Sequence, residues 1–301
     1  MLHAIDNGLP VPAELIAPFA ESGALLANPA ALRARFAADG YLFLRGALPV
    51  DDVAAARAEV ATRLFEVDEL GVPPAAAIAT GRSRRSAPSF DRGAFWESVS
   101  TGPQLRALSH GAAVSSILRA VLGAEPMAHD FIFLRAAARG RATGIHYDHP
   151  FFGRATENVV TTWVPLGDVP LAEGPLFVVE GSNRFDDLIA AMRQLDIVKA
   201  PEKKAAYAMT AVEFARSRKT RLLTADFRGG DVLLLGMFTA HGAFDNVSPV
   251  DRVRLSFDIR YQPAHEPRDE RYFSARPGGT TGAGYAELNG ARPLLEAWHV
   301  R

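Results

Sequence analysis

The first 125 residues carry hydrophobic positions at the three- and four-residue spacing of α-helices. Each predicted helix has a start or stop signal: Gly40 ends the first, Asp51 or Asp52 caps the second, and Gly123 ends the third. The predicted helices cover residues 30–39, about 51–64 and 112–122, and a short buried strand, Tyr41–Leu44, follows the first helix.

From about residue 126 the pattern changes to short apolar runs separated by glycine and proline. Many short strands with such spacing are typical of a β-sandwich or a double-sheet jelly roll. Residues 184–218 interrupt this pattern with two helices around Pro201, which we interpret as an insertion. The predicted strands are Met127–Leu134, Val159–Leu166, Leu176–Val179, Val232–Leu235 and Arg254–Tyr261.

These patterns predict a mainly β protein with flanking helices, organised as one domain over residues 1–301. The N-terminal helices would occupy about 1–125 and the jelly-roll core about 126–265. The sequence has no internal repeat and no obvious linker. Its composition, 48% hydrophobic and 22% charged, provides ample material for a core of this size.

Charge and cysteine content exclude several functional classes. The formal net charge of −1 gives no global electrostatic reason to expect nucleic acid or an anionic membrane as a partner. We interpret the basic clusters Arg82–Arg85 and Arg216–Lys219 as solvated surface. Cysteine is absent, which excludes disulfides, thiolate catalysis and cysteine-ligated metal sites. We expect a cytoplasmic protein, because Met1–Gly8 lacks the features of a secretory signal and no apolar run is as long as a membrane span.

A histidine and a carboxylate lie two positions apart in His146-Tyr147-Asp148, and His241 lies far downstream after an apolar strand. In an extended strand, residues two apart point to the same side. Two histidines and one carboxylate on one face form the facial triad of non-haem Fe(II) oxygenases. Any single histidine is more often a core or surface residue than a ligand, so the argument depends on the joint pattern. His149 would face the other way, and we do not expect it to be a ligand.

Polar and apolar residues alternate from Arg252 to Tyr261. Arg254 and Ser256 share one face of this predicted strand, where a guanidinium and a hydroxyl could hold a carboxylate together. This pair is a suitable cradle for the distal carboxylate of 2-oxoglutarate. An exposed strand face with arginine–aspartate cross-strand pairs explains the pattern equally well. For Arg135, a surface or structural ion pair is favoured over a contact with an anionic substrate.

Beyond these motifs, the chain resembles the phytanoyl-CoA hydroxylase (phytanoyl-CoA dioxygenase) family of Fe(II)/2-oxoglutarate-dependent oxygenases. The resemblance covers most of the length and depends on a series of blocks in order. The blocks are residues 36–46 (FAADGYLFLRG), 144–152 (GIHYDHPFF), 162–166 (TWVPL), 174–183 (GPLFVVEGSN), 241–246 (HGAFDN) and 254–262 (RLSFDIRYQ).

The resemblance implies a double-stranded β-helix, the cupin-like jelly roll, and assigns roles to particular residues. His146, Asp148 and His241 would bind the iron. Arg254 and Ser256 would bind 2-oxoglutarate, with the aromatic Trp163 beside it. The segment after His241 is slightly longer here than in the family pattern, so Arg252 competes with Arg254 for this role.

The implied reaction uses Fe(II), 2-oxoglutarate and O2 to hydroxylate, or otherwise oxidise, an unactivated C–H bond of a small-molecule metabolite, with release of succinate and CO2. Desaturation, epoxidation and cyclisation belong to the same chemistry, and the family extends to natural-product tailoring enzymes. Two alternatives are a zinc-dependent hydrolase on the same three ligands and a non-catalytic jelly-roll binding protein. The sequence does not specify the substrate or the oligomeric state.

Overall fold

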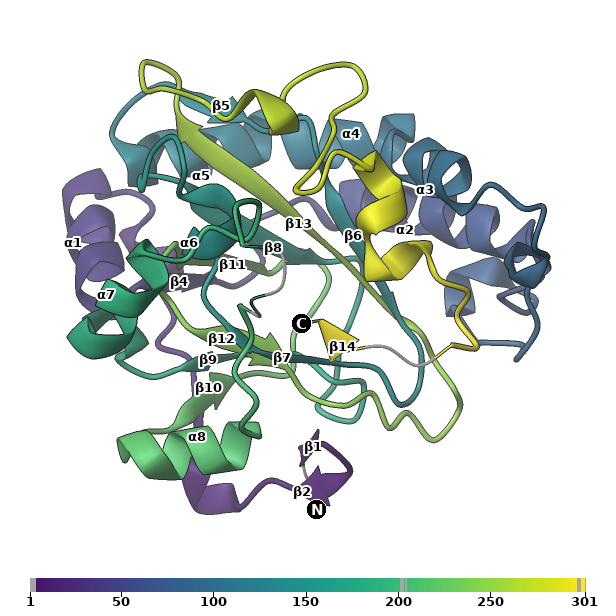
Figure 1. Ribbon diagram of the computed structural model, residues 1–301, viewed down its shortest axis with the longest axis horizontal. Coiled ribbons are helices and arrows are strands. Elements are labelled where there is room, and N and C mark those ends of the chain that lie inside the picture. Colours follow the sequence, from purple (N-terminus) through teal and green to yellow (C-terminus); the bar gives the residue numbers. More distant parts are fainter. Residues whose placement is uncertain (1–3, 201–202, 204, 297–298, 301) are drawn as a thin grey trace.

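Two six-stranded β-sheets face each other at the centre of the molecule (Figure 1). The computed structural model describes residues 4–200, 203, 205–296 and 299–300. In the first sheet the strand order is β4-β11-β8-β13-β5, and β6 also pairs with β13. Its strands are β4 (Tyr41–Leu44), β11 (Val232–Gly236), β8 (Val160–Pro165), β13 (Arg254–Pro263), β5 (Pro126–Ala128) and β6 (Phe133–Ala137).

The second sheet has the order β14-β7-β12-β9-β10-β3 and provides the wall opposite β13. Its strands are β14 (His299–Val300), β7 (Ala142–His146), β12 (His241–Ala243), β9 (Leu176–Val179), β10 (Leu222–Thr224) and β3 (Ile16–Pro18). A separate two-stranded sheet joins β1 (Ile5–Asp6) to β2 (Leu9–Pro10). The two large sheets form the predicted jelly roll, and they remain two separate sheets rather than one closed barrel.

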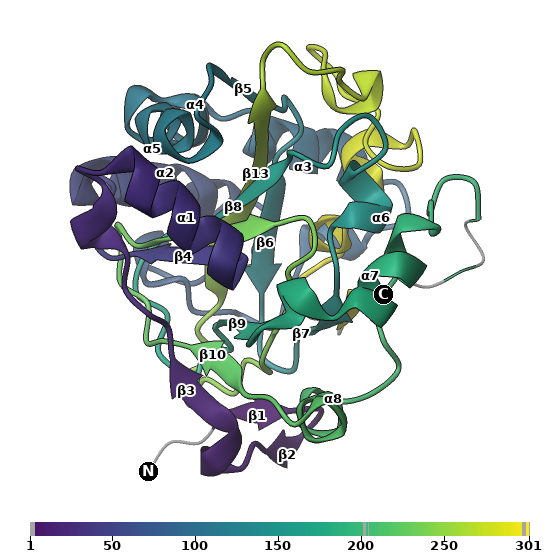
Figure 2. The ribbon, with the colours of Figure 1, turned by 90° about the vertical axis from the view of Figure 1, so that its left-hand side faces the viewer.

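Helices cover the outer faces of the sheets (Figures 1 and 2). Helices α2 to α5 pack on the first sheet through one large apolar core, while α8 packs on the second sheet through a smaller one. The helices are α1 (Pro29–Asp39), α2 (Val50–Phe65), α3 (Arg92–Ser100), α4 (Pro103–His110), α5 (Ala112–Leu122), α6 (His149–Phe152), α7 (Asp186–Arg193) and α8 (Ala211–Arg218). Among the described residues, no helix is long and apolar enough to cross a membrane.

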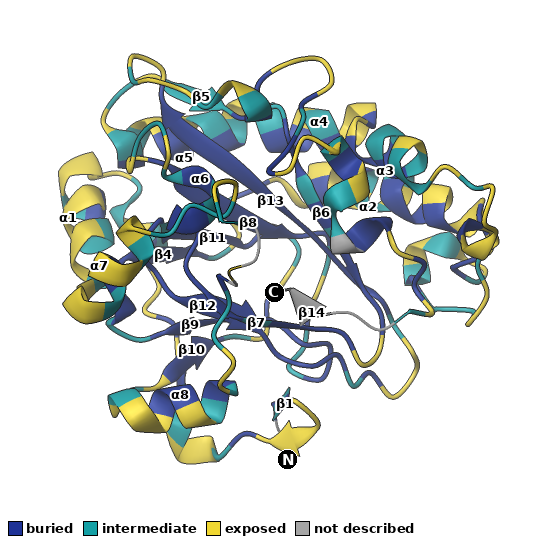
Figure 3. Cartoon of the chain, in the orientation of Figure 1, coloured by how far each residue is buried: buried dark blue, intermediate teal, exposed yellow. Residues whose placement is uncertain are grey.

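Strand β13 carries the feature that matters most for function. All ten of its residues are buried, as the dark blue diagonal strand in Figure 3 shows. Its apolar side chains join the core under the helices: Leu255, Phe257, Ile259 and Tyr261. Because side chains alternate along a strand, the intervening polar side chains face the space between the sheets. They are Arg254, Ser256, Asp258, Arg260 and Gln262. The alternative prediction, an exposed polar face on this strand, is therefore wrong.

Most predicted elements are confirmed, two of them with changed bounds, and helices α3 and α4 were not predicted. The single strand predicted over Met127–Leu134 is two strands, because β5 pairs with the end of β13 and β6 pairs with its beginning. Helix α2 begins at Val50, so the acidic residues predicted as caps, Asp51 and Asp52, lie in its first turn instead. There they favour the helix through its dipole. Helices α7 and α8 lie between β9 and β10, and Pro201 is outside the described residues.

The basic cluster Arg82–Arg85 is not all solvated surface, as the sequence had suggested. Arg85 is completely buried and pairs with Glu69, with 2.8 Å between Nη2 and Oε2. Its guanidinium also donates to the backbone carbonyls of Gly290, Ala291 and Arg292. A buried arginine needs such a complete set of acceptors. This ion pair therefore fixes residues 290–292 against the loop that precedes α3.

Candidate metal centre and cosubstrate pocket

The two candidate histidine ligands lie directly opposite each other on neighbouring strands. His146 ends β7, and His241 begins β12 as its antiparallel partner. A Cβ atom at Gly242 would lie 2.6 Å from the Thr143 carbonyl oxygen, so glycine allows this close approach of β12 to β7. The carboxylate of Asp148 is not positioned by the strand, in contrast to the prediction from the sequence. Asp148 is not part of the extended strand, because the chain turns after His146 and Asp148 precedes α6.

The three side chains nevertheless converge. Each of His146, Asp148 and His241 offers one ligand atom, and these atoms lie within 4.8 Å of one another. Oδ1 of Asp148 is 3.6 Å from Nε2 of His146 and 4.0 Å from Nε2 of His241. All three residues are buried. One small cation could contact all three atoms, and a site with two imidazoles and one carboxylate suits Fe(II).

Backbone carbonyls determine which imidazole nitrogen faces the site. Nδ1 of His146 is 2.9 Å from the carbonyl oxygen of Gly144, and Nδ1 of His241 is 2.9 Å from that of Thr239. A carbonyl only accepts, so each Nδ1 carries the proton and each Nε2 presents a lone pair. Burial and the nearby His241 lower the pKa of His146 to about 3, so its imidazole is neutral at physiological pH. Both histidines thus have the tautomer that a metal ion requires.

The carboxylate of Asp148 is held through the oxygen that faces away from the histidines. Its Oδ2 accepts a hydrogen bond from the Thr161 hydroxyl and another from Nη2 of Arg260, at 3.1 Å. Nε of Arg260 also donates to the Thr161 oxygen at 3.2 Å. Burial alone would raise the pKa of Asp148, but Arg260 and the other neighbours outweigh it and hold the pKa well below its usual range. The carboxyl group is therefore ionised, and its Oδ1 can bind a metal ion.

Arg260 is itself held by two aromatic rings. Its guanidinium carbon lies 4.1 Å from the ring centre of Phe152 and 4.4 Å from that of Phe133. Cation–π contacts of this kind are strongest for a desolvated guanidinium, and Arg260 is only 2% exposed. The aromatic rings, the arginine and the threonine together fix the orientation of Asp148. None of these supporting roles was recognised in the sequence.

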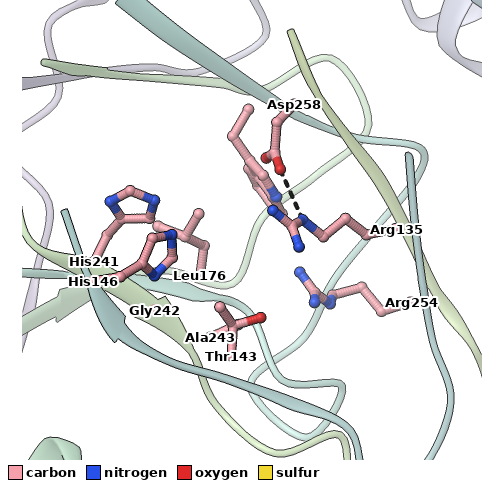
Figure 4. Close-up of a pocket in the computed structure, with 10 residues that line it drawn as sticks. Arg135, Thr143, His146, Leu176, His241, Gly242, Ala243, Arg254 and Asp258 are labelled. Atoms are coloured by element: carbon pink, nitrogen blue, oxygen red, sulfur yellow. Dashed lines mark hydrogen bonds and ion pairs between the residues drawn. The ribbon is translucent and has the colours of Figure 1, made fainter. Parts of the chain in front are cut away.

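A pocket connects the metal-binding cluster to the polar face of β13 (Figure 4). His146 and His241 line one side, while Arg254 and Arg135 extend into the pocket from the other side. The remaining lining residues are Thr143, Trp163, Leu176, Gly242, Ala243 and Asp258. The arrangement places guanidinium groups and metal-ligand atoms in a single buried space.

Arg254 is fully buried, and its hydrogen-bonding capacity is not satisfied by the protein. Its Nε and the hydroxyl of Ser256 have no hydrogen-bond partner among the described residues. Burial and the positive charge of Arg135 lower the pKa of Arg254 to about 10, while Asp258 raises it, so the guanidinium stays charged at neutral pH. Leaving such donors unpaired is costly, and it is typical of a site that receives an anion. Two unpartnered donors on one face of β13 are the arrangement that a bound anion such as a carboxylate would require.

The competing residue, Arg252, lies elsewhere. Nη1 of Arg252 forms an ion pair with Oε1 of the buried Glu173 at 3.0 Å, and its side chain is 41% exposed. It does not line the pocket, whereas Arg254 does. Trp163 on β8 also lines the pocket, and its ring packs edge-on against Phe227 with 4.7 Å between the ring centres. His149 is not part of the metal-binding cluster: it stacks on Phe238 with 4.7 Å between the ring centres.

Sequence reasoning missed the pairing within the pocket. Arg135 forms an ion pair with Asp258, with 2.7 Å between Nε and Oδ2, and both residues line the pocket. An ion pair was the favoured role for Arg135 from the sequence, but its place beside the metal-binding cluster was not predicted. A signal was present, because Asp258 and Arg260 continue the face of Arg254 and Ser256 at two-residue intervals. Their burial, however, depends on the opposite sheet.

Two facing sheets around a histidine–aspartate–histidine cluster are the architecture of the jelly-roll oxygenases that use non-haem iron. The model of the phytanoyl-CoA dioxygenase (PhyH) family matches residues 36–253, which is most of the chain. The chain therefore belongs to this family of Fe(II)/2-oxoglutarate-dependent oxygenases, and it is an enzyme of that class. A comparison with curated protein sequences found no match.

Solved structures show the same fold at low sequence identity. The carbocyclase SnoK from nogalamycin biosynthesis is 22% identical, with a TM-score of 0.56 over 92% of this chain and 96% of its own. The epimerase SnoN, solved with Fe3+, α-ketoglutarate and nogalamycin RO, is 21% identical, with a TM-score of 0.54 over 83% and 87%. EctD from S. alaskensis, solved with bound Fe, is 18% identical, with a TM-score of 0.53 over 90% and 88%.

Proposed function

We propose that this chain uses Fe(II), 2-oxoglutarate and O2 to hydroxylate an unactivated C–H bond of a small-molecule metabolite, with release of succinate and CO2. Family membership supports the oxygenase class. The observation that carries the residue assignment is the shared pocket, where a metal-binding cluster and a buried arginine with an unpartnered Nε meet.

In this proposal the iron ligands are Nε2 of His146, Nε2 of His241 and Oδ1 of Asp148. All three atoms face one point, and the atoms on the far side of each ligand are already engaged by the protein. Three ligands on one face leave other coordination positions open. When bound, the iron and the cosubstrate supply the oxidising chemistry, and the protein provides position and a water-poor environment.

Arg254 and Ser256 are proposed to hold the distal carboxylate of 2-oxoglutarate. A charged fork and a hydroxyl two residues away on the same strand face can both donate to one carboxylate. Trp163 would provide an apolar wall beside the cosubstrate chain. With the distal end fixed in this way, the keto-acid end of the cosubstrate would extend along the pocket towards the histidines.

The substrate side of the site is proposed to be partly apolar. Phe151, in α6, lies edge-on to the His146 ring with 6.4 Å between centroids, and it is only half-buried. SnoN is solved with the small molecule nogalamycin RO, and we propose a small-molecule substrate for this chain on the same fold. The net charge of −1 supports neither nucleic acid nor a membrane as partner, and the absence of cysteine supports a cytoplasmic setting.

The pocket favours this function over a zinc-dependent hydrolase on the same three ligands. A hydrolase needs a metal-bound water but has no use for a buried arginine with an unpartnered Nε in the same pocket as the two histidines. A binding protein without catalysis would likewise not need the ordered carboxylate of Asp148. Both alternatives predict no consumption of 2-oxoglutarate.

The direct test adds Fe(II) and 2-oxoglutarate to the protein without oxygen and records the weak visible metal-to-ligand charge-transfer band. We expect the band in the wild type and its loss in His146→Ala and His241→Ala. Admission of oxygen should then release succinate from the wild type alone, with a metabolite screen identifying substrates that accelerate the release. The proposal would be refuted if the wild-type protein shows no band, or if it shows hydrolytic activity with zinc and without 2-oxoglutarate.

A further inference from the structure

The pocket contains two arginines on neighbouring strands, which is one more than a single carboxylate requires. In the antiparallel pair of β6 and β13, Arg135 lies directly opposite Ser256, and Arg254 lies opposite Ala137. Arg135 and Arg254 are therefore diagonal neighbours on the same face. Figure 4 shows both guanidinium groups extending towards the histidine side of the pocket.

Two like charges on neighbouring strands repel each other and destabilise a sheet, and burial increases this repulsion. One carboxylate, Asp258, accompanies the two guanidiniums, and it contacts Arg135 through Nε. Two positive charges and one negative charge leave one positive charge in the pocket. One further carboxylate would balance it. Asp258 thus balances one of the two positive charges, and a bound group with one negative charge would balance the other.

The hydrogen bonding of Arg135 leaves its outer edge available. Among the described residues, its only hydrogen bond is the one from Nε to Asp258. Arg85 provides the contrast within this protein, because its Nε and both Nη atoms all donate to protein acceptors. Arg85 is fully buried in the interior, whereas Arg135 is 17% exposed and lines the pocket. Asp258 therefore orients Arg135 without using its two Nη groups.

We propose that Arg135 is a second cosubstrate-binding residue, which contacts the distal carboxylate of 2-oxoglutarate together with Arg254 and is aimed by Asp258. This inference rests on the proposed function and deepens it, because it assigns the selection of a dicarboxylate cosubstrate to three side chains. Two charged donors on one carboxylate make the site discriminate strongly against 2-oxo acids that lack it.

The test compares two ligands in the holoprotein with Fe(II) under anaerobic conditions. The ligands are 2-oxoglutarate and 2-oxovalerate, which share the keto-acid end and differ in the distal carboxylate. Binding is followed by the charge-transfer band and by calorimetry. For Arg135→Gln, we expect 2-oxoglutarate to bind at least about tenfold more weakly, since a charge-assisted hydrogen bond is lost. Binding of 2-oxovalerate should change by less than about twofold, because this ligand has no group for Arg135 to contact.

The matched control is Arg252→Gln, which removes an arginine that forms an ion pair with Glu173 outside the pocket. We expect unchanged affinity for both ligands. Equal weakening of both ligands by Arg135→Gln would overturn the inference, because Arg135 would then act on the metal end or on the pocket as a whole. An unchanged affinity for 2-oxoglutarate would overturn it as well.

A double variant separates direct contact from simple neutralisation of Asp258. Arg135→Gln alone leaves Asp258 unpaired beside the ligand, whereas Arg135→Gln with Asp258→Asn removes both charges. We expect the double variant to bind 2-oxoglutarate about fivefold or more below wild type, and this variant also serves if the single variant does not fold. Full recovery of affinity would mean that Arg135 only neutralises Asp258. A missing wild-type band would contradict the proposed function itself, whereas a normal band with an indifferent Arg135→Gln contradicts only this inference.

Discussion

Arg254→Gln is expected to weaken cosubstrate binding strongly and to leave the fold intact. Arg254 is 3% exposed, and its Nε has no partner among the described residues. Loss of a buried charged partner costs about 2–5 kcal/mol of binding free energy, and each 1.4 kcal/mol is tenfold. We therefore expect the Kd for 2-oxoglutarate to rise by roughly 30-fold to several thousandfold.

The unpartnered Nε of Arg254 also predicts how Arg254→Gln affects thermal stability. A buried guanidinium without a full set of acceptors contributes little to stability and carries a desolvation cost. Glutamine at position 254 should therefore leave the Tm unchanged or raise it slightly, whereas a structural arginine would lower it. Differential scanning calorimetry of the metal-free protein measures this effect.

The assay for binding is the anaerobic titration of Fe(II)-loaded protein with 2-oxoglutarate, followed by the visible charge-transfer band. Arg252→Gln is the control, because Arg252 is paired with Glu173 at 3.0 Å and does not line the pocket. Weak binding in Arg252→Gln together with normal binding in Arg254→Gln would refute the choice between the two arginines.

Three further predictions concern the support of the site and the stability of the fold. Thr161→Val, nearly isosteric, removes a hydrogen bond to Oδ2 of Asp148 and should weaken Fe(II) binding about tenfold in a metal titration; unchanged affinity would mean that the threonine does not orient the carboxylate. Burial lowers the pKa of His129 from 6.5 to about 3, so the unfolded chain takes up a proton in this range that the folded chain excludes. The contribution of His129 to stability should therefore be complete above pH 6.5 and fall with acidification by up to about 1.4 kcal/mol per pH unit, and His129→Leu should reduce the total slope by about this amount in urea unfolding at pH 4–7; an unaltered slope would contradict this assignment. Arg85→Met leaves Glu69 buried and unpaired and should cost about 3–5 kcal/mol of unfolding free energy, against less than 1 kcal/mol if the pair is not structural.

The strands could be predicted because their signals are local, whereas the candidate ligands were predicted from a joint pattern in which His241 lies far downstream of His146 and Asp148. Apolar runs such as Leu176–Val179 and Val232–Leu235 have the length and composition of buried strands, and the structure places strands there. The alternation from Arg254 onwards correctly placed Arg254 and Ser256 on one face. The roles of these residues came from the family resemblance, since the alternation alone fitted an exposed face equally well.

What could not be predicted depends on contacts between distant segments. Arg260 and Thr161 support Asp148 because β8 and β13 pair in one particular register, which no local pattern specifies. Arg85 is buried because residues 290–292 pack over it, although the basic residues beside it in the sequence predicted a solvated surface. The turn after His146 shows a further limit, because Asp148 meets the two histidines through a turn that begins a helix and not through the alternation of a strand.

In the proposed site, three side chains bind one ferrous ion through defined atoms. The most direct measurement is a crystal structure of the protein loaded with Fe(II) under anaerobic conditions. We expect iron bonded to Nε2 of His146, Nε2 of His241 and Oδ1 of Asp148, with Nδ1 of each histidine still donating to its backbone carbonyl. Iron bound elsewhere, or a metal that omits one of these three atoms, would contradict it.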